Sequence, residues 1–281
     1  MRSIRLGVLA VLLAVPIVRA SAQSAPLDTS HVDKTFFTKR DAVIAGATLA
    51  ASGIVSIFDK RIANWTQQPN IQGSSSRHDL VDNLTFVNEQ PLTIAALATY
   101  GIGRLTHSPT VADVGLHTTE SLVLTVAISE LIRSPLGRAR PRESPDDQYN
   151  FHFGKGFTDF ASRSYPSIHA AVAWAAATSL VSEMHERNSS AATWAAPVLY
   201  TAALIPGFTR MYLNQHWASD VVAGSVLGAL LGHKVVHYAH THERSKLDRV
   251  LLGTTLAPDR YGNLLLVKTI PFGGGASADD R

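Results

Sequence analysis

Residues 168–184 read IHAAVAWAAATSLVSEM, an apolar stretch in which alanine is the commonest residue. Its length and its small side chains predict a helix that packs closely against other helices. Five further apolar stretches have helical length, and Asp, Ser or Pro stands near the start of several of them: 42–58, 91–105, 111–132, 191–208 and 217–238. We therefore predict an all-α fold, a helical bundle of about six core helices. The polar run 67–82 between the first two stretches is expected to be a loop.

The two ends of the chain differ from this helical part. Residues 1–22 combine Arg2 and Arg5 with an apolar run and an A-x-A signature, which is typical of a secretory signal peptide cleaved after Ala22. An uncleaved N-terminal anchor is the alternative. Residues 251–281 hold two apolar segments around a turn-like DRYGN, consistent with a short C-terminal β-hairpin followed by a disordered tail. The helical domain is predicted to span residues 23–250.

The charge and the cysteine count exclude several functions. The net charge of +3 comes from residues 1–22, because without them the chain has 22 basic and 22 acidic residues. No nucleic-acid partner is therefore expected. The absence of cysteine excludes thiol catalysis, disulfides and Cys-ligated metals.

Two short segments at predicted helix ends carry residues suited to an anion. The first follows the third helix and contains four arginines, whose planar guanidinium groups bind phosphate oxygens well: Arg133, Arg138, Arg140 and Arg142. A basic surface loop is the alternative. In the second segment, Ser167 can cap the next helix, so that its first N–H groups point at an anion. His169, in the first turn, could protonate a leaving group, and a solvated histidine on an ordinary capped helix is the alternative.

A third segment, residues 209–220, reads TRMYLNQHWASD. If the chain is helical from His216 onward, the i,i+4 spacing places His216 and Asp220 on one face, where the carboxylate can accept the imidazole N–H. A surface or capping pair is the alternative. With Arg210, the three segments supply what a phosphohistidine hydrolase requires, namely cations, a general acid, a neutral imidazole nucleophile and a carboxylate that orients it.

Together these segments resemble the signature of the type 2 phosphatidic acid phosphatase superfamily, which includes bacterial class A acid phosphatases and vanadium haloperoxidases. Residues 133–141 match the motif K-x6-R-P with Arg133 in place of lysine. Residues 166–169 match P-S-G-H with Ile168 in place of glycine, and residues 209–220 match S-R-x5-H-x3-D with Thr209 in place of serine. The resemblance spans residues 90–240 and implies a helical phosphatase.

The resemblance also implies a role for each matching residue. His216 would be the nucleophile that becomes phosphorylated, Asp220 its orienting partner, and His169 the acid and later the base. The phosphate would be held by Arg133, Arg140, Ser167, the backbone N–H of Ile168, and Arg210. No metal and no cofactor are implied. A branched side chain at position 168 would lie at the mouth of the site, which is tolerated if its φ is helical.

We therefore expect an exported phosphatase that hydrolyses phosphomonoesters or lipid (pyro)phosphates, with a phosphorylated small molecule or lipid as its partner. Two alternatives use the same pocket: a vanadium-dependent haloperoxidase, which would bind vanadate, and a non-catalytic envelope protein that binds phosphate. The sequence distinguishes neither the substrate nor the oligomeric state.

The relation to a membrane rests on helix length and topology. Several uncharged cores are shorter than the about 20 residues that a bilayer needs. A cleaved signal and an even number of spans would put the loop between the third and fourth helices in the cytoplasm, which is awkward for an exported hydrolase. We therefore favour a periplasmic bundle that is soluble or peripherally attached, with an integral membrane protein as the alternative.

Three other segments contain histidines or aromatic residues outside the motifs. The aromatic segment 149–160, with Gly154 and Gly156, predicts a mobile lid over the substrate, and an ordinary surface loop is the alternative. His117 and Glu120 are predicted to form a buried hydrogen-bonded pair. Residues 233–243, HKVVHYAHTHE, predict a solvated helix end and not a zinc site.

Overall fold

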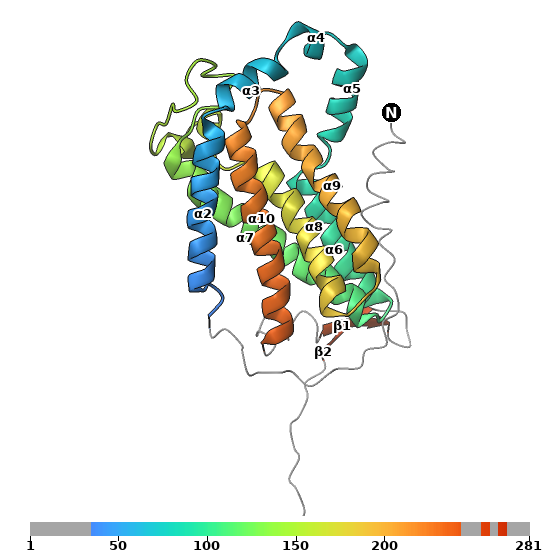
Figure 1. Cartoon of the computed structure of the whole chain (residues 1–281). Helices are drawn as coiled ribbons and strands as arrows, with labels where there is room; N and C mark the ends of the chain where they lie inside the picture. Colours follow the sequence, from blue (N-terminus) through green and yellow to red (C-terminus); the bar gives the residue numbers. More distant parts are fainter. Residues whose placement is uncertain (1–34, 243–253, 259–263, 269–281) are drawn as a thin grey trace, which may run out of the picture.

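The computed structural model describes residues 35–242, 254–258 and 264–268 (Figure 1). Within 35–242 the chain forms a series of α-helices: α2 (Lys39–Ser56), α3 (Asp59–Thr66), α4 (Pro69–Gln72), α5 (Ser75–Leu84), α6 (Glu89–Leu105), α7 (Pro109–Leu136), α8 (Ile168–Glu186), α9 (Ala191–Tyr212) and α10 (Ala218–Thr241). Two short 3-10 helices, η2 (Lys155–Phe157) and η3 (Phe160–Ser162), lie between α7 and α8. The predicted signal peptide lies outside the described residues.

The helical class and the six long helices are confirmed, with ends within a few residues of the predicted ones. The prediction of a loop at 67–82 was wrong, because this polar run forms α4 and most of α5. Pro69 occupies the start of α4, and the Ser74 side chain accepts the N–H of Arg77 to cap α5. Local capping therefore makes helices here without an apolar face, which is the feature on which the loop prediction depended.

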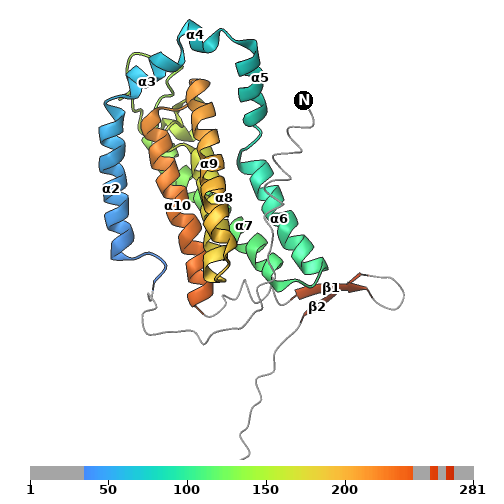
Figure 2. The ribbon, with the colours of Figure 1, turned by 45° about the vertical axis from the view of Figure 1, so that its right-hand side comes forward.

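Helix α8 forms the centre of the bundle and packs against α7, α9 and α10 (Figures 1 and 2). Its alanines are buried, and α10 approaches it closely because Gly228 and Gly232 face the backbone of Ala171 and Ala175, where a Cβ would collide. Ser167 also donates its N–H to the carbonyl of Asp220. Because these contacts follow one another in the same order along both helices, α8 and α10 run parallel. Their N-termini therefore lie side by side at one end of the bundle.

Two short strands follow the bundle, β1 (Thr254–Pro258) and β2 (Leu264–Lys268). They pair antiparallel, with Leu256 opposite Leu266. They lie in the segment where a hairpin is predicted, but the connection between them and the rest of the tail fall outside the described residues. The hairpin and the disordered tail therefore stay predictions.

Three helices are long and apolar enough to cross a membrane, namely α7, α9 and α10, and α2 with α3 forms a further candidate bent by 58°. Large apolar side chains point outward from α2, α6, α7 and α9: Val43, Leu49, Ile54, Ile94, Ile102, Val123, Leu131, Val198, Leu204 and Phe208. An outer surface of this kind is unfavourable in water and favourable against lipid. The described helices thus support association with a membrane.

Candidate active site

The three sequence motifs meet at the end of the bundle where α8 and α10 begin. Arg133 comes from the last turn of α7, Arg210 from the last turn of α9, and His169 from the first turn of α8. Arg140 lies in the segment after α7, which turns at Gly137. Gly137 has a φ of +63°, and a Cβ there would collide with the carbonyl of His152. A glycine is thus needed at the turn that directs this segment into the site.

His216 lies in the turn before α10, not within the helix, because α10 begins at Ala218. Its Nδ1 lies 2.8 Å from the carbonyl oxygen of Ser164 and 3.6 Å from Oδ2 of Asp220. A carbonyl can only accept, so Nδ1 carries the hydrogen and donates it to Ser164. The prediction that Asp220 accepts this N–H was therefore wrong, although its charge lies next to the ring.

The other ring nitrogen of His216 is left free by this tautomer. Nε2 is buried, has no hydrogen-bond partner among the described residues, and carries a lone pair in the neutral ring. Burial lowers the pKa of His216 despite the opposing effect of Asp220, which favours the neutral ring. The rings of His216 and His169 lie 6.0 Å apart between centroids. His216 thus presents an unprotonated nitrogen to the site.

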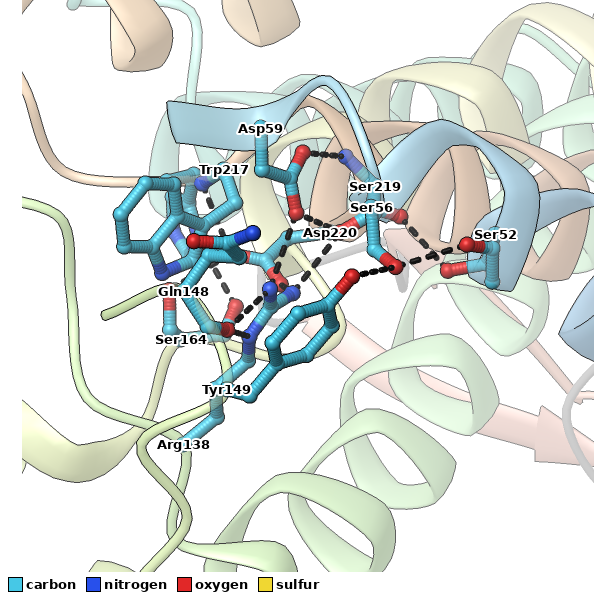
Figure 3. Close-up of polar contacts among 12 residues, drawn as sticks. Ser52, Ser56, Asp59, Arg138, Gln148, Tyr149, Ser164, Trp217, Ser219 and Asp220 are labelled. Carbon is cyan, nitrogen blue, oxygen red and sulfur yellow. Dashed lines mark hydrogen bonds and ion pairs between the residues drawn. The ribbon is translucent and has the colours of Figure 1, made fainter. Parts of the chain in front are cut away.

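Asp220 is held by a set of donors that the motifs do not contain (Figure 3). Arg138 donates from Nη1 to Oδ1 at 2.5 Å, and Ser164 donates its hydroxyl to Oδ2 at 2.5 Å. The N–H of Trp217 also donates to Oδ2, at 2.8 Å. Asp220 is fully buried, so these donors stabilise its charge and fix its position beside His216.

Asp59 extends this network to the first residue of α3 (Figure 3). Its Oδ2 accepts from Nη2 of Arg138 at 2.9 Å, and its Oδ1 accepts the N–H of Ser219 at 2.9 Å. It also accepts the hydroxyl of Ser219 and is fully buried. Sequence reasoning missed Asp59 and Ser164. It placed Arg138 among the arginines suited to bind phosphate, whereas in the structure its guanidinium binds Asp59 and Asp220.

The site contains a cluster of buried polar atoms without a partner among the described residues. They belong to the predicted phosphate-binding and catalytic residues: Nε and Nη1 of Arg133, Nε and Nη2 of Arg140, Nε of Arg210, Oγ of Ser167, Nδ1 of His169 and Nε2 of His216. Each unsatisfied buried group costs on the order of 1–3 kcal/mol. Their concentration at one place indicates an anionic ligand that would satisfy them together.

Positive charge dominates this cluster. The pKa of Arg140 is lowered to about 10, first by burial and then by Arg142, Arg133 and Arg210. The pKa of His169 is lowered to about 2, first by burial and then by Arg210, His216 and two further arginines. A dianion would offset the charges that hold His169 neutral. The site therefore combines a concentration of positive charge with a neutral histidine, an arrangement that suits an anion such as phosphate.

One carboxylate faces His169 from outside the motifs. Oε2 of Glu89, the first residue of α6, lies 3.7 Å from Nε2 of His169. This oxygen is buried and has no hydrogen-bond partner among the described residues. Glu89 can stabilise an imidazolium at His169, and sequence reasoning missed it because it lies 80 residues away in the chain.

Residues 167 and 168 take different roles from those expected. Ser167 is the N-cap residue of α8, as predicted, but its side chain makes no capping bond and is left for a ligand. Ile168 is the first helical residue and is 4% exposed, packing in a cluster with Leu122 and Val172. Its side chain lies in the core and not at the mouth of the site, so the replacement of glycine does not obstruct the ligand.

The segment predicted as a mobile lid is bound to the site along its length. Asn150 and Ala161 accept backbone N–H groups from Ala139 and Arg140, and Gly156 packs against the backbone of Ser134, where a Cβ would collide. These contacts make Gly156 a packing residue, not a hinge. Within this segment, Phe160 contacts the cluster, with its ring centroid 4.4 Å from the Arg140 guanidinium carbon.

Comparison with known proteins identifies the class to which this fold and site belong. The model of the PAP2 superfamily matches residues 115–244, which include the motif residues from all three segments. With this match, which covers less than half of its length, the chain is supported as a PAP2 superfamily member. It is similar to the transmembrane PAP2-type phosphatidylglycerolphosphate phosphatase from Bacillus subtilis, with a TM-score of 0.53 and 17% identity, over 72% of this chain and 98% of that one.

Three curated relatives are named as phosphatases. The chain is 42% identical over 72 residues to a lipid A 1-phosphatase of Porphyromonas gingivalis, 26% of this chain and 15% of that protein. It is 25% identical to an undecaprenyl-diphosphatase of Sulfolobus acidocaldarius, over 49% of this chain and 61% of that protein. It is 29% identical to a lipid A 4'-phosphatase of Bacteroides thetaiotaomicron, over 55% of this chain and 66% of that protein. The chain thus spans less than two thirds of each.

These similarities and the three apolar helices support a membrane-associated protein. Of the predicted relations to the membrane, a soluble bundle is therefore not supported, whereas attachment to the membrane is. The helices that contain the short uncharged cores are themselves long enough to cross a bilayer, since α7, α9 and α10 have 28, 22 and 24 residues. Buried polar residues such as Asp220 are satisfied inside the bundle and do not face lipid.

Proposed function

We propose that this chain is a lipid phosphate phosphatase that works through a phosphohistidine intermediate. The observation that carries the proposal is the cluster of buried, unpartnered donors around the free Nε2 of His216. In this proposal the guanidinium groups of Arg133, Arg140 and Arg210, with Ser167 and the N–H of Ile168, bind the phosphoryl oxygens. No metal or cofactor takes part in the steps below.

In the first step, Nε2 of His216 attacks phosphorus. A P–N bond forms while the P–O bond to the leaving group breaks, and His169 gives its proton to the departing oxygen. Ser164 accepts the Nδ1–H throughout, and Asp220 offsets the positive charge that develops on the ring. The arginines stabilise the charge on the phosphoryl oxygens, which is the largest contribution expected in such a site.

In the second step, water attacks the phosphohistidine. His169, now neutral, takes a proton from the water as the P–O bond forms and the P–N bond breaks. Phosphate leaves and His216 returns to the Nδ1–H tautomer. Burial and then the nearby arginines lower the pKa of His169 to about 2 in the free site. The charge of the bound phosphoryl group offsets the arginines and so raises this pKa, which allows His169 to act as an acid in the first step.

An apolar groove beside the site favours a lipid as the leaving group. It has a volume of about 590 Å³ and lies between α6 and α7, lined by Thr93, Ile94, Val123, Val126, Ala127 and Glu89. Glu89, which lines the groove, also lies 3.7 Å from Nε2 of His169, so the groove is separated from this histidine by one side chain. The relatives named for lipid substrates point the same way and do not favour the haloperoxidase alternative.

Trapping the intermediate tests this proposal. The purified wild-type protein, incubated with a ³²P-labelled lipid phosphate and quenched in alkali, should carry label on histidine. His216→Ala should carry none and hydrolyse nothing, whereas His169→Asn should release product slowly from lipids, whose alkoxide leaving groups need a proton.

His237→Ala is the matched control, since His237 lies on α10 with a side chain 55% exposed and far along the helix from the site. It should label and hydrolyse like the wild type. Hydrolysis by His216→Ala within about tenfold of the wild type would contradict the phosphohistidine mechanism.

A further inference from the structure

Three potential metal ligands meet at the end of the bundle opposite the active site. His117 lies in the early part of α7, Glu183 near the end of α8 and His240 in the last turn of α10. Nδ1 of His117 is 2.5 Å from Oε1 of Glu183, and Nε2 of His240 is 3.2 Å from Oε2. All the ligand atoms lie within 4.8 Å of one another.

These contacts differ from the sequence predictions for both histidine segments. The carboxylate that Nδ1 of His117 contacts is Glu183 of another helix, where the sequence predicted Glu120. His240 turns its ring towards His117, with centroids 5.6 Å apart, while its neighbour His237 is exposed and pairs with Glu186. Only part of the predicted solvated helix end is therefore solvated.

We propose that His117, Glu183 and His240 form a metal site for a divalent transition ion, with zinc as the best-suited occupant. Two imidazoles and one carboxylate are a ligand set that zinc prefers, with water as the fourth ligand. In a tetrahedral zinc site neighbouring ligand atoms are about 3.3 Å apart, so small side-chain rotations bring the three atoms into place.

Burial and access both suit a bound ion. Glu183 and His117 have side chains 1% and 6% exposed, so their positions are fixed by the surrounding helices. The His240 side chain is 22% exposed and provides the route by which an ion enters and a water ligand exchanges. Since the ligands come from three helices, the ion would hold α7, α8 and α10 together at this end.

The surrounding charges are compatible with a dication. Arg187 donates to Oε2 of Glu183 at 2.7 Å and lies 3.4 Å from Oδ2 of Asp113. With neutral histidines, these two carboxylates and one guanidinium leave a single negative charge to offset the ion. Arg187 fixes the orientation of the ligating carboxylate but opposes the ion by its charge.

The site is separate from the proposed phosphatase chemistry. Glu183 follows His169 by 14 residues on α8, about 21 Å along a helix. We therefore expect the ion to affect the thermal stability of the bundle and not the chemical step. The inference does not rest on the proposed function, because neither the ligands nor their test involves phosphate.

Cobalt and zinc binding to the full chain, purified without a histidine tag, tests the inference. After chelation and reloading, the wild type should retain about one equivalent of zinc per chain after desalting, and cobalt should give the visible absorption of a four-coordinate site. His117→Ala and His240→Gln should lose both signals, whereas His237→Ala on the same helix should keep them. Added zinc should raise the unfolding temperature of the wild type and of His237→Ala only.

A substitution at Arg187 separates a metal site from a network of charges. Arg187→Gln removes the cation that opposes the ion, so zinc affinity should rise by about tenfold or more. A site that serves only as an ion-pair network would lose stability in this variant and gain no affinity. Retention of less than about a tenth of an equivalent by the wild type, or equal retention by His240→Gln, would overturn the inference.

Discussion

Nη1 of Arg138 lies 2.5 Å from Oδ1 of Asp220, and the same guanidinium donates from Nη2 to Asp59 at 2.9 Å. All three side chains are buried, with 2% or less of each exposed. One planar cation therefore bridges two carboxylates from α3 and α10, and it fixes the carboxylate that lies beside the proposed nucleophile. This relationship makes Arg138 a positioning residue, although it is not one of the motif residues.

Replacing Arg138 by lysine should slow turnover. A compact ammonium cannot donate to Asp59 and Asp220 at once with the geometry of the guanidinium, so Asp220 should lose its fixed position. We expect kcat to fall by about tenfold or more, equivalent to about 1.4 kcal/mol, with little change in KM because Arg138 does not touch the substrate. Arg142→Lys, an exposed position in the same segment, is the control and should leave kcat unchanged. Equal effects of both substitutions would contradict the bridge.

Asp59 and Arg138 should show coupled effects on activity. Asp59→Asn leaves Arg138 with one carboxylate, and Arg138→Met leaves two buried carboxylates without their cation. The double variant removes both charges. The factor by which its kcat/KM falls should therefore be smaller than the product of the factors measured for the two single variants. The same cycle with exposed Asp79 in place of Asp59 should be additive. Additive effects for Asp59 and Arg138 would show that the network does not reach the active site.

Glu89→Gln should affect proton transfer by His169. Without the carboxylate 3.7 Å from Nε2, the imidazolium is less stable when the phosphate is bound. Hydrolysis should slow most for esters with poor leaving groups, since these need the proton most. The check is the dependence of kcat/KM on the pKa of the leaving alcohol, which should become steeper in this variant. An equal reduction for all leaving groups would mean that Glu89 acts only in binding.

Binding of a tetrahedral dianion should take up a proton at His169. The pKa of His169 is lowered to about 2 in the free site, and the dianion raises it by offsetting the arginines. A group that gains a proton on binding makes binding tighter as the pH falls. The affinity rises by up to about tenfold per pH unit between the pKa of His169 in the complex and its pKa in the free site. Tungstate does not itself titrate in this range, so its inhibition constant should decrease from pH 8 to pH 6. His169→Asn should remove this pH dependence. If the inhibition constant of the variant changed with pH as it does in the wild type, proton uptake at His169 would be contradicted.

Filling the groove between α6 and α7 should discriminate against lipids. Ala127→Trp places a large ring among the groove residues, so KM for a long-chain lipid phosphate should rise by about tenfold, while a short soluble ester should be hydrolysed normally. Val198→Trp, on the exposed face of α9, is the control and should change neither. A parallel loss on both substrates would argue against the groove as the lipid site.

The amino-acid sequence by itself determined the six long helices and the three phosphate motifs. Helix length, apolar composition and capping residues are local properties, and the motif residues lie at helix ends that can be located in the same way. The sequence therefore predicted that Arg133, His169, Arg210 and His216 would serve one site, and the structure places them at one end of the bundle. It failed at α4 and α5, where capping forms helices without an apolar face.

Only the tertiary structure decided the partners of these residues. Ser164 accepts from His216 across 52 residues, Asp59 reaches Arg138 across 79, and His117 meets Glu183 across 66. Each contact depends on how α3, α7, α8 and α10 pack, and no local spacing encodes it. The close approach of α10 to α8 at Gly228 and Gly232 sets that packing. It fixes both the tautomer of the proposed nucleophile and the three ligands at the far end of the bundle.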